Sequence, residues 1–142
     1  MKQFIIGLII TTVFLACSER NDAQTVKRTL AETSWYGEKQ AKEKDEDGNT
    51  LLYSAHILFE DDTVCTVSEI VYLVEQDMAS SYPRFQGTYK IEGPFIYITN
   101  PSGHQGQGQE TYTLKFDGDK IAYTGIYADY TLEKQAEREN NE

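Results

Sequence analysis

The chain has 142 residues and carries 23 acidic against 13 basic side chains, which gives a formal net charge of −10 at pH 7. So acidic a surface repels the phosphates of nucleic acids and anionic lipid headgroups, and we therefore expect no nucleic-acid binding. The length suits one domain of ordinary size.

The first sixteen residues have the pattern of an export signal. Met1 and Lys2 give a positive start, residues 4–14 form an apolar run broken only by two threonines, and small residues then lead to Cys17. The apolar run is too short to span a bilayer, which needs ~20 apolar residues. We expect residues 1–16 to be removed as a signal peptide, which takes away Lys2 and moves the net charge from −10 to about −11.

The stretch Phe14-Leu15-Ala16-Cys17 resembles the lipobox of bacterial lipoproteins. The resemblance implies transfer of a diacylglyceryl group to the Cys17 sulfur, cleavage before this residue, and acylation of the new amino group. Two or more acyl chains anchor a protein stably, whereas one holds only marginally. Ser18 replaces the Asp that retains enteric lipoproteins in the inner membrane. We therefore expect a lipid-anchored protein of the outer membrane, on its periplasmic face or at the cell surface.

Cys65 has no partner for an internal disulfide if Cys17 is acylated. It lies in Val64-Cys65-Thr66-Val67, a strand-like run without a basic neighbour that would activate the thiol. We predict that Cys65 is a small buried hydrophobic residue.

The remaining chain divides into a polar tether at residues 17–29, a β domain at residues 30–134 and a charged tail at residues 135–142. Short apolar runs separated by turn residues predict eight strands in the domain. The first strand begins at Ser34–Gly37, and the others are predicted at Leu51–Phe59, Thr63–Val74, Arg84–Glu92, Phe95–Thr99, Thr111–Asp117, Ile121–Tyr127 and Tyr130–Leu132.

Alternation is clearest in residues 84–92, where polar residues alternate with Phe85, Gly87, Tyr89 and Ile91. This period of two is typical of a strand with one buried and one solvated face. The same period in residues 51–59 places His56 on the face opposite the apolar residues. Brief turns and a longer polar loop at residues 100–109 join the strands. The pattern favours an all-β domain, an antiparallel up-and-down meander closed as an eight-stranded barrel, with a β-sandwich as the alternative.

Four features together resemble the small lipocalin-like lipoproteins of the Bacteroidetes. They are Trp35 near the first strand, the central segment 87–93, the turn at residues 116–120, and the closing Tyr130-Thr131-Leu132. The likeness spans about residues 30–134. It implies a lipocalin-like barrel with its ligand, if it has one, held among inward-pointing side chains.

Inward-pointing aromatic residues are the best candidates for a ligand pocket. An eight-stranded barrel is just wide enough to be filled by side chains or to hold one small ligand, and both alternatives stay open. The candidate pocket residues are Trp35, Tyr53, Phe85, Tyr89, Tyr112, Tyr123 and Tyr130.

Motifs for catalysis or metal binding are missing from the sequence. It contains no Gly-x-Ser-x-Gly, phosphate-binding loop or His-Glu-x-x-His, so we expect no enzyme. Residues 43–48 begin like a calcium loop, but Ser54 occupies the twelfth position, where a bidentate Glu is needed. His56 and His104 lack the spacing of a zinc site, so no catalytic, metal or cofactor site is predicted.

These observations predict a non-enzymatic lipoprotein, anchored in the outer membrane through Cys17, with a lipocalin-like barrel that binds a small hydrophobic or aromatic ligand. The alternative is a protein-interaction module, such as an inhibitor, an immunity-type lipoprotein or an accessory subunit of an envelope complex. The acidic surface and the missing catalytic motifs favour that alternative.

Overall fold

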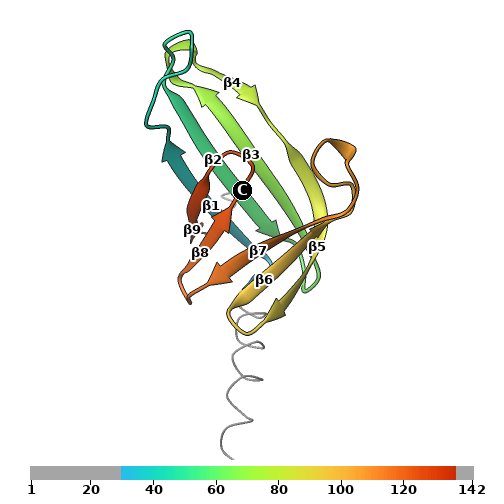
Figure 1. Ribbon diagram of the computed structural model, residues 1–142. Coiled ribbons are helices and arrows are strands. Elements are labelled where there is room, and N and C mark those ends of the chain that lie inside the picture. The colour runs from blue at the N-terminus through green and yellow to red at the C-terminus, as the bar shows by residue number, and fades with distance from the viewer. Residues whose placement is uncertain (1–29, 137–142) are drawn as a thin grey trace, which may run out of the picture.

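The computed structural model describes residues 30–136, in which short strands follow one another along the chain (Figure 1). Two 3-10 turns, η1 (Val74–Gln76) and η2 (His104–Gly106), interrupt the strands. The strands are β1 (Thr33–Gln40), β2 (Leu51–Phe59), β3 (Val64–Leu73), β4 (Met78–Ser81), β5 (Arg84–Glu92), β6 (Phe95–Asn100), β7 (Glu110–Phe116), β8 (Lys120–Thr124) and β9 (Asp129–Lys134).

Every pairing in the sheet is antiparallel, and the pairings close a ring. The order β2-β1-β9-β8-β7-β6-β5-β3 ends where it began, because every residue of β2 also pairs with a residue of β3. Eight strands therefore form a closed barrel, which leaves no long open edge in that ring. The prediction of an all-β, up-and-down barrel is confirmed, and the closed ring excludes the sandwich.

The ninth strand, β4, is an addition that the sequence did not predict. It pairs only with β3, beyond the residues that β3 shares with β5. Asp77 reverses the chain just before β4 with a left-handed backbone (φ 51°). β4 has only four residues, and none of them is buried. The sequence therefore shows no alternation of polar and apolar side chains that would indicate this strand.

The predicted strand at residues 121–127 was too long at its C-terminal end. β8 stops at Thr124, and the backbone N–H of Gly125 bonds the carbonyl of Ala128 at 2.9 Å to close a turn. The N–H groups of Ile126 and Tyr127 donate to a carboxylate instead of a neighbouring strand. Residues 125–128 are therefore a loop.

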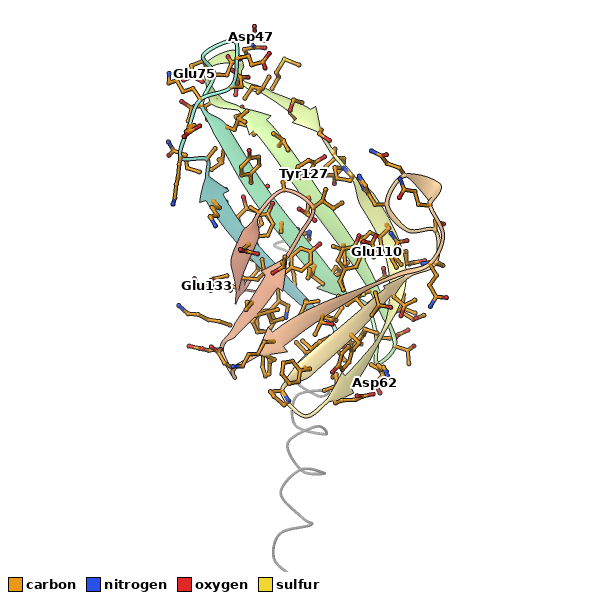
Figure 2. All side chains as sticks on the ribbon, in the orientation of Figure 1. Asp47, Asp62, Glu75, Glu110, Tyr127 and Glu133 are labelled. Atoms are coloured by element: carbon orange, nitrogen blue, oxygen red, sulfur yellow. The ribbon has the colours of Figure 1, made fainter. Side chains whose placement is uncertain are left out.

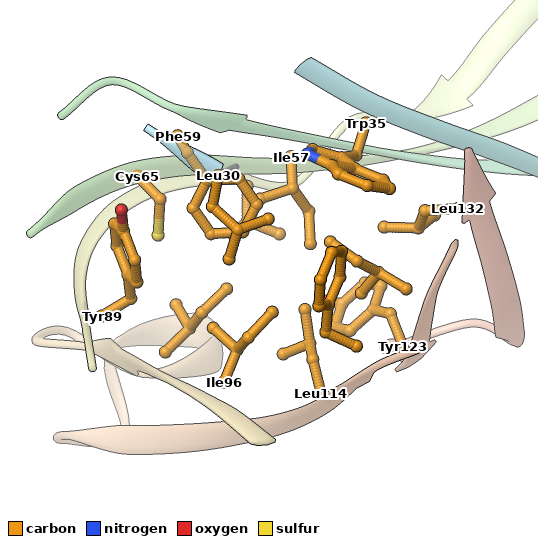
Figure 3. Close-up of a cluster of buried hydrophobic side chains, with 14 of the residues drawn as sticks. Leu30, Trp35, Ile57, Phe59, Cys65, Tyr89, Ile96, Leu114, Tyr123 and Leu132 are labelled. Carbon is orange, nitrogen blue, oxygen red and sulfur yellow. The ribbon is translucent and has the colours of Figure 1, made fainter. Parts of the chain in front are cut away.

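The hydrophobic core fills the interior between facing strands (Figure 3). Trp35 is 1% exposed and meets Phe116 edge-on, with ring centroids 5.7 Å apart. Phe59 and Tyr89 make a second edge contact at 4.8 Å. Burial of one such large side chain stabilises the fold by roughly 1.5–3 kcal/mol. Across the interior, Ile57 and Trp35 face Ile96, Leu114 and Tyr123 (Figure 3).

One end of the barrel is closed by short turns and by Leu30, which is fully buried. The Thr33 hydroxyl donates to the Leu30 carbonyl, and the Trp35 indole N–H donates to that hydroxyl at 2.8 Å. These bonds fix the point at which the chain enters the barrel. The other end carries the loops at residues 101–109 and 125–128 (Figure 1).

The predicted signal peptide, Cys17 and the tether lie outside the described residues, as does the tail from residue 137. Gln135, the first residue of the predicted tail, still donates its backbone N–H to the Ser34 carbonyl at 2.8 Å. Within residues 30–136, the structure contains no helix of the length and hydrophobicity needed to cross a bilayer.

Candidate functional site

The seven aromatic residues predicted to line a pocket lie together on the inner face of the barrel. Four are almost fully buried in the core, and three are partly buried and pack against it. Successive rings touch: Phe85 stacks on Tyr112 at 5.5 Å, and Tyr123 meets both Tyr112 at 6.2 Å and Tyr130 at 5.8 Å. The buried four are Trp35, Tyr89, Tyr123 and Tyr130, and the partly buried three are Tyr53, Phe85 and Tyr112. These rings pack as a filled interior, and ligand binding among them stays a prediction.

A carboxylate lies at the centre of this aromatic group. Glu69 on β3 is 2% exposed, and its oxygens accept hydrogen bonds from the hydroxyls of Tyr123 at 2.7 Å and Tyr130 at 3.2 Å. The backbone N–H of Ile126 bonds both oxygens at 2.9 and 3.0 Å, and that of Tyr127 donates at 3.3 Å. A buried charge is tolerated only when it is so well bonded. Glu69 therefore ties the loop at residues 125–128 to β3.

Tyr127 extends this tie to the far wall of the barrel. Its ring stacks on Tyr53 of β2 with centroids 6.1 Å apart, and its hydroxyl lies 2.6 Å from that of Ser81 on β4. Figure 2 shows Tyr127 on the loop that arches toward the long strands. The loop thus bridges opposite walls at this end.

Burial raises the pKa of both Tyr123 and Tyr130, and the nearby charge of Glu69 adds to the effect. Both phenols therefore stay protonated at neutral pH, and each can donate to the carboxylate. The bonding of Glu69 depends on this protonation state.

The outer face of β1, β2 and β3 carries a groove of about 740 Å³. Outward-pointing side chains line it because they alternate with the core residues of the same strands. Because Ser34 and Ser68 have short side chains, the groove is deeper at these positions than beside their larger neighbours. The residues of β1, β2 and β3 that line it are Thr33, Ser34, Tyr36, His56, Leu58, Ser68 and Ile70, and Lys134 of β9 joins them.

Strand register places a polar pair in this groove. His56 lies directly opposite Tyr36 on one side and Ser68 on the other. Its Nε2 atom is 2.6 Å from the Ser34 hydroxyl oxygen, so one hydrogen bond joins the two side chains. Burial lowers the pKa of His56, and the positive charge of Arg84 lowers it further. The imidazole is therefore neutral at pH 7.

Charged groups surround this pair. Lys134 and Glu32 line the groove, and Arg84 lies opposite Ser68 across the β3–β5 pairing. The Tyr36 hydroxyl donates to the carboxylate of Glu38 on the same strand. Burial and that carboxylate raise the pKa of Tyr36 to about 12.

The period of two in residues 51–59 predicts that His56 lies on the face opposite the apolar residues, but no pattern in the sequence indicates the groove. The partner of His56 is Ser34, twenty-two residues away, and only the β1–β2 register brings the two together. The period of two in both strands predicts which side chains face outward, yet not which of them meet.

Two other sequence candidates have local structural roles. Asp45, in the segment that begins like a calcium loop, accepts hydrogen bonds from the backbone N–H groups of Asp47 and Asn49 at 3.1 and 2.7 Å. Cys65 is fully buried, as predicted, and burial raises the pKa of its thiol to about 12. Among residues 30–136, no three His, Cys, Asp or Glu side chains gather in a way that could hold a metal ion.

Comparison with known proteins finds no family model, no curated protein and no solved structure that matches this chain.

Proposed function

We propose that this protein is a non-enzymatic, lipid-anchored lipoprotein of the outer membrane whose lipocalin-like barrel binds a small hydrophobic or aromatic ligand. The observation that carries this proposal is the groove on β1, β2 and β3. Its volume of about 740 Å³ falls within the usual range of small-molecule sites. Leu58 and Ile70 supply apolar surface, and Ser34 and His56 supply a few convergent polar groups, as such sites require.

The filled interior supports a site on the outer face. Rings from Trp35 to Tyr130 occupy the barrel, and the loop at residues 125–128 is bonded to Glu69 in the interior. A ligand in the interior would have to displace packed side chains, whereas one in the groove would not. The barrel then serves as a rigid frame that fixes the floor of the groove.

The anchor rests on the sequence of residues 1–17. A charged start, a short apolar run and Cys17 after small residues support export followed by acylation. A tether of residues 18–29 would reach at most ~40 Å when extended. It would join the barrel beside Leu30, at the closed end, and so hold that end toward the membrane.

Native mass spectrometry of the full chain purified from its own envelope tests this proposal. We expect a bound low-mass molecule that is lost when the groove variant Leu58→Glu is purified in the same way. Phe95→Glu is the matched control, because Phe95 on β6 is 40% exposed and Leu58 is 37% exposed. Equal thermal unfolding of the two variants would show that both fold. A ligand retained by Leu58→Glu, or no ligand on any form, would defeat the proposal.

A protein-interaction module is the second candidate, and the open edge of β4 favours it. β4 pairs only with β3; Met78 at its start is 48% exposed, and Val74 in the preceding turn is 47% exposed. An edge strand of this kind can accept an extended segment of a partner. A pull-down from solubilised envelopes with the original chain and with the Ala79→Pro variant tests this candidate. If it is right, the original chain recovers a partner protein and the variant does not.

A further inference from the structure

We propose that the ligand of the groove is an anion, a molecule with one carboxylate or similar acidic group on an apolar body. This inference rests on the proposed function, since it names the chemical class of the ligand in the same groove. Its basis is the juxtaposition of Ser34 and His56 with Lys134 and apolar side chains that line the same groove, and with Arg84 directly across from Ser68.

The polar pair provides hydrogen-bond donors where the acidic group would lie. Ser34 and His56 are joined at 2.6 Å, and Ser68 lies directly across from His56 on β3. Hydroxyl and imidazole N–H groups both donate to carboxylate oxygens. Bonds to an ionised acceptor are about twice as strong as neutral ones, which favours an acid over its amide.

Charge complementarity also favours an anion. The chain has 23 acidic and 13 basic side chains, yet two of the basic groups lie close to this pair. Lys134 lines the groove, and the charge of Arg84 acts directly on His56. Of the acidic side chains nearby, Glu32 lines the groove, Glu38 is engaged by the Tyr36 hydroxyl, and Glu133, directly opposite Tyr36 on β9, is paired with Lys120 at 3.2 Å. Glu60 interacts with the charge of Arg84.

Leu58, Ile70 and Tyr82 form the apolar part of the groove. Leu58 is 37% and Tyr82 is 56% exposed, so both have surface left to bury. An aliphatic or aromatic body would cover that surface, and its burial would contribute the hydrophobic part of the affinity. A small free anion such as phosphate lacks this part and is expected to bind weakly.

Binding should couple to protonation of His56. A neighbouring anion favours the imidazolium form and so raises the pKa of His56, which burial and Arg84 hold low in the free protein. Lys134 opposes this rise, whereas the carboxylates of Glu32, Glu38 and Glu133 support it. By linkage, the acid should bind more tightly as the pH falls through the raised pKa.

The two histidines allow a direct test. The full chain, labelled with ¹³C in histidine and held in lipid nanodiscs, is titrated with 4-phenylbutyrate and with its neutral isostere 4-phenylbutyramide. We expect the acid to shift the His56 resonance, raise its pKa and bind about tenfold more tightly than the amide. His104, in the loop between β6 and β7, should not shift and serves as an internal control.

Variants separate the acidic group from the apolar body. Lys134→Gln and His56→Gln should lower affinity for the acid toward that for the amide and leave the amide unchanged; with His56→Gln, binding is followed by the ¹³C-labelled ligand. Lys115→Gln, an exposed lysine on β7, is the matched control and should bind the acid like the original chain.

The possible outcomes distinguish the anion proposal from the proposed function. Equal binding of acid and amide, with no effect of Lys134→Gln, would overturn the anion proposal and leave a simple apolar site intact. A His56 resonance unmoved by either compound would overturn the proposed function as well. Binding of the acid that shifts His104 instead of His56 would place recognition elsewhere and overturn both.

Discussion

The Tyr123 hydroxyl donates a hydrogen bond of 2.7 Å to the Glu69 carboxylate in the interior of the barrel. Tyr123 comes from β8 and Glu69 from β3, so the bond joins opposite walls. Tyr130 on β9 adds a second hydroxyl at 3.2 Å. The carboxylate thereby links three strands and the loop at residues 125–128 through one buried group.

We predict that Glu69→Gln destabilises the protein by roughly 2–4 kcal/mol, because an amide presents donors to groups that already donate and loses the charge they stabilise. Urea unfolding followed by fluorescence measures this change. Glu133→Gln removes an exposed carboxylate paired with Lys120 at 3.2 Å and should change stability little. Similar values for the two variants would refute a structural role for Glu69.

Gly125→Ala should also destabilise the fold, and the cause is the same carboxylate. A Cβ atom on Gly125 would lie 2.5 Å from a Glu69 oxygen, closer than atoms can approach. The cost should largely disappear in a Glu69→Ala background, which removes the clashing atoms. A double-mutant cycle by urea unfolding checks this, and additive effects would contradict it.

Stability should fall as the pH rises between about 10 and 12. Burial, as the largest effect, raises the pKa of Tyr89 and Tyr112 to about 12. An unfolded tyrosine ionises near 10, so above this pH the unfolded state holds fewer protons and becomes favoured. Absorbance at 295 nm together with urea unfolding from pH 9 to 12 follows both events. Constant stability across this range would show that these phenols are solvated.

Cys65 should resist thiol reagents until the barrel unfolds. The side chain is fully buried, and burial raises the pKa of its thiol to about 12, so almost no thiolate exists at pH 8. Iodoacetamide labelling of the native protein, read by mass spectrometry with and without urea, gives the measurement. Rapid labelling without urea would contradict the buried position.

Cys17→Ala should abolish fatty-acid attachment, because the acyl groups depend on that sulfur and on the amino group that cleavage exposes. Metabolic labelling with an alkyne-tagged fatty acid, followed by detection on a gel, checks this. Cys65→Ala is the control and should keep the label. Label that persists on Cys17→Ala would disprove the anchor.

The closed barrel could be predicted because its strands obey a simple period. In residues 84–92, Phe85, Gly87 and Tyr89 point inward as expected, and the turns after β5 and β7 lie where glycine marks them. The strand β4 escaped prediction because its exposed residues lack a buried face. The end of β8 could not be predicted, because the backbone N–H of Ile126 donates to the Glu69 carboxylate and not to a neighbouring strand. Glu69 is fifty-seven residues away in the sequence.

The candidate site could be predicted only in part. The prediction that aromatic side chains such as Trp35 and Tyr123 lie inside is confirmed. How closely these rings pack depends on contacts between strands, which the alternation of polar and apolar residues does not specify. Likewise, Glu69 lies in an apolar run and gives no local sign of its partners. The groove depends on which outward side chains become neighbours across β1, β2 and β3, and therefore on register.

The position of a bound probe tests the central claim most directly, namely that packed side chains fill the interior and that the ligand binds on the outer face. Intermolecular nuclear Overhauser effects between 4-phenylbutyrate and ¹³C-labelled methyl groups of the full chain in nanodiscs report that position. We predict contacts from the phenyl ring to Leu58 and Ile70. Contacts to Leu114 and Ile121, which are fully buried inside the barrel, would contradict the claim.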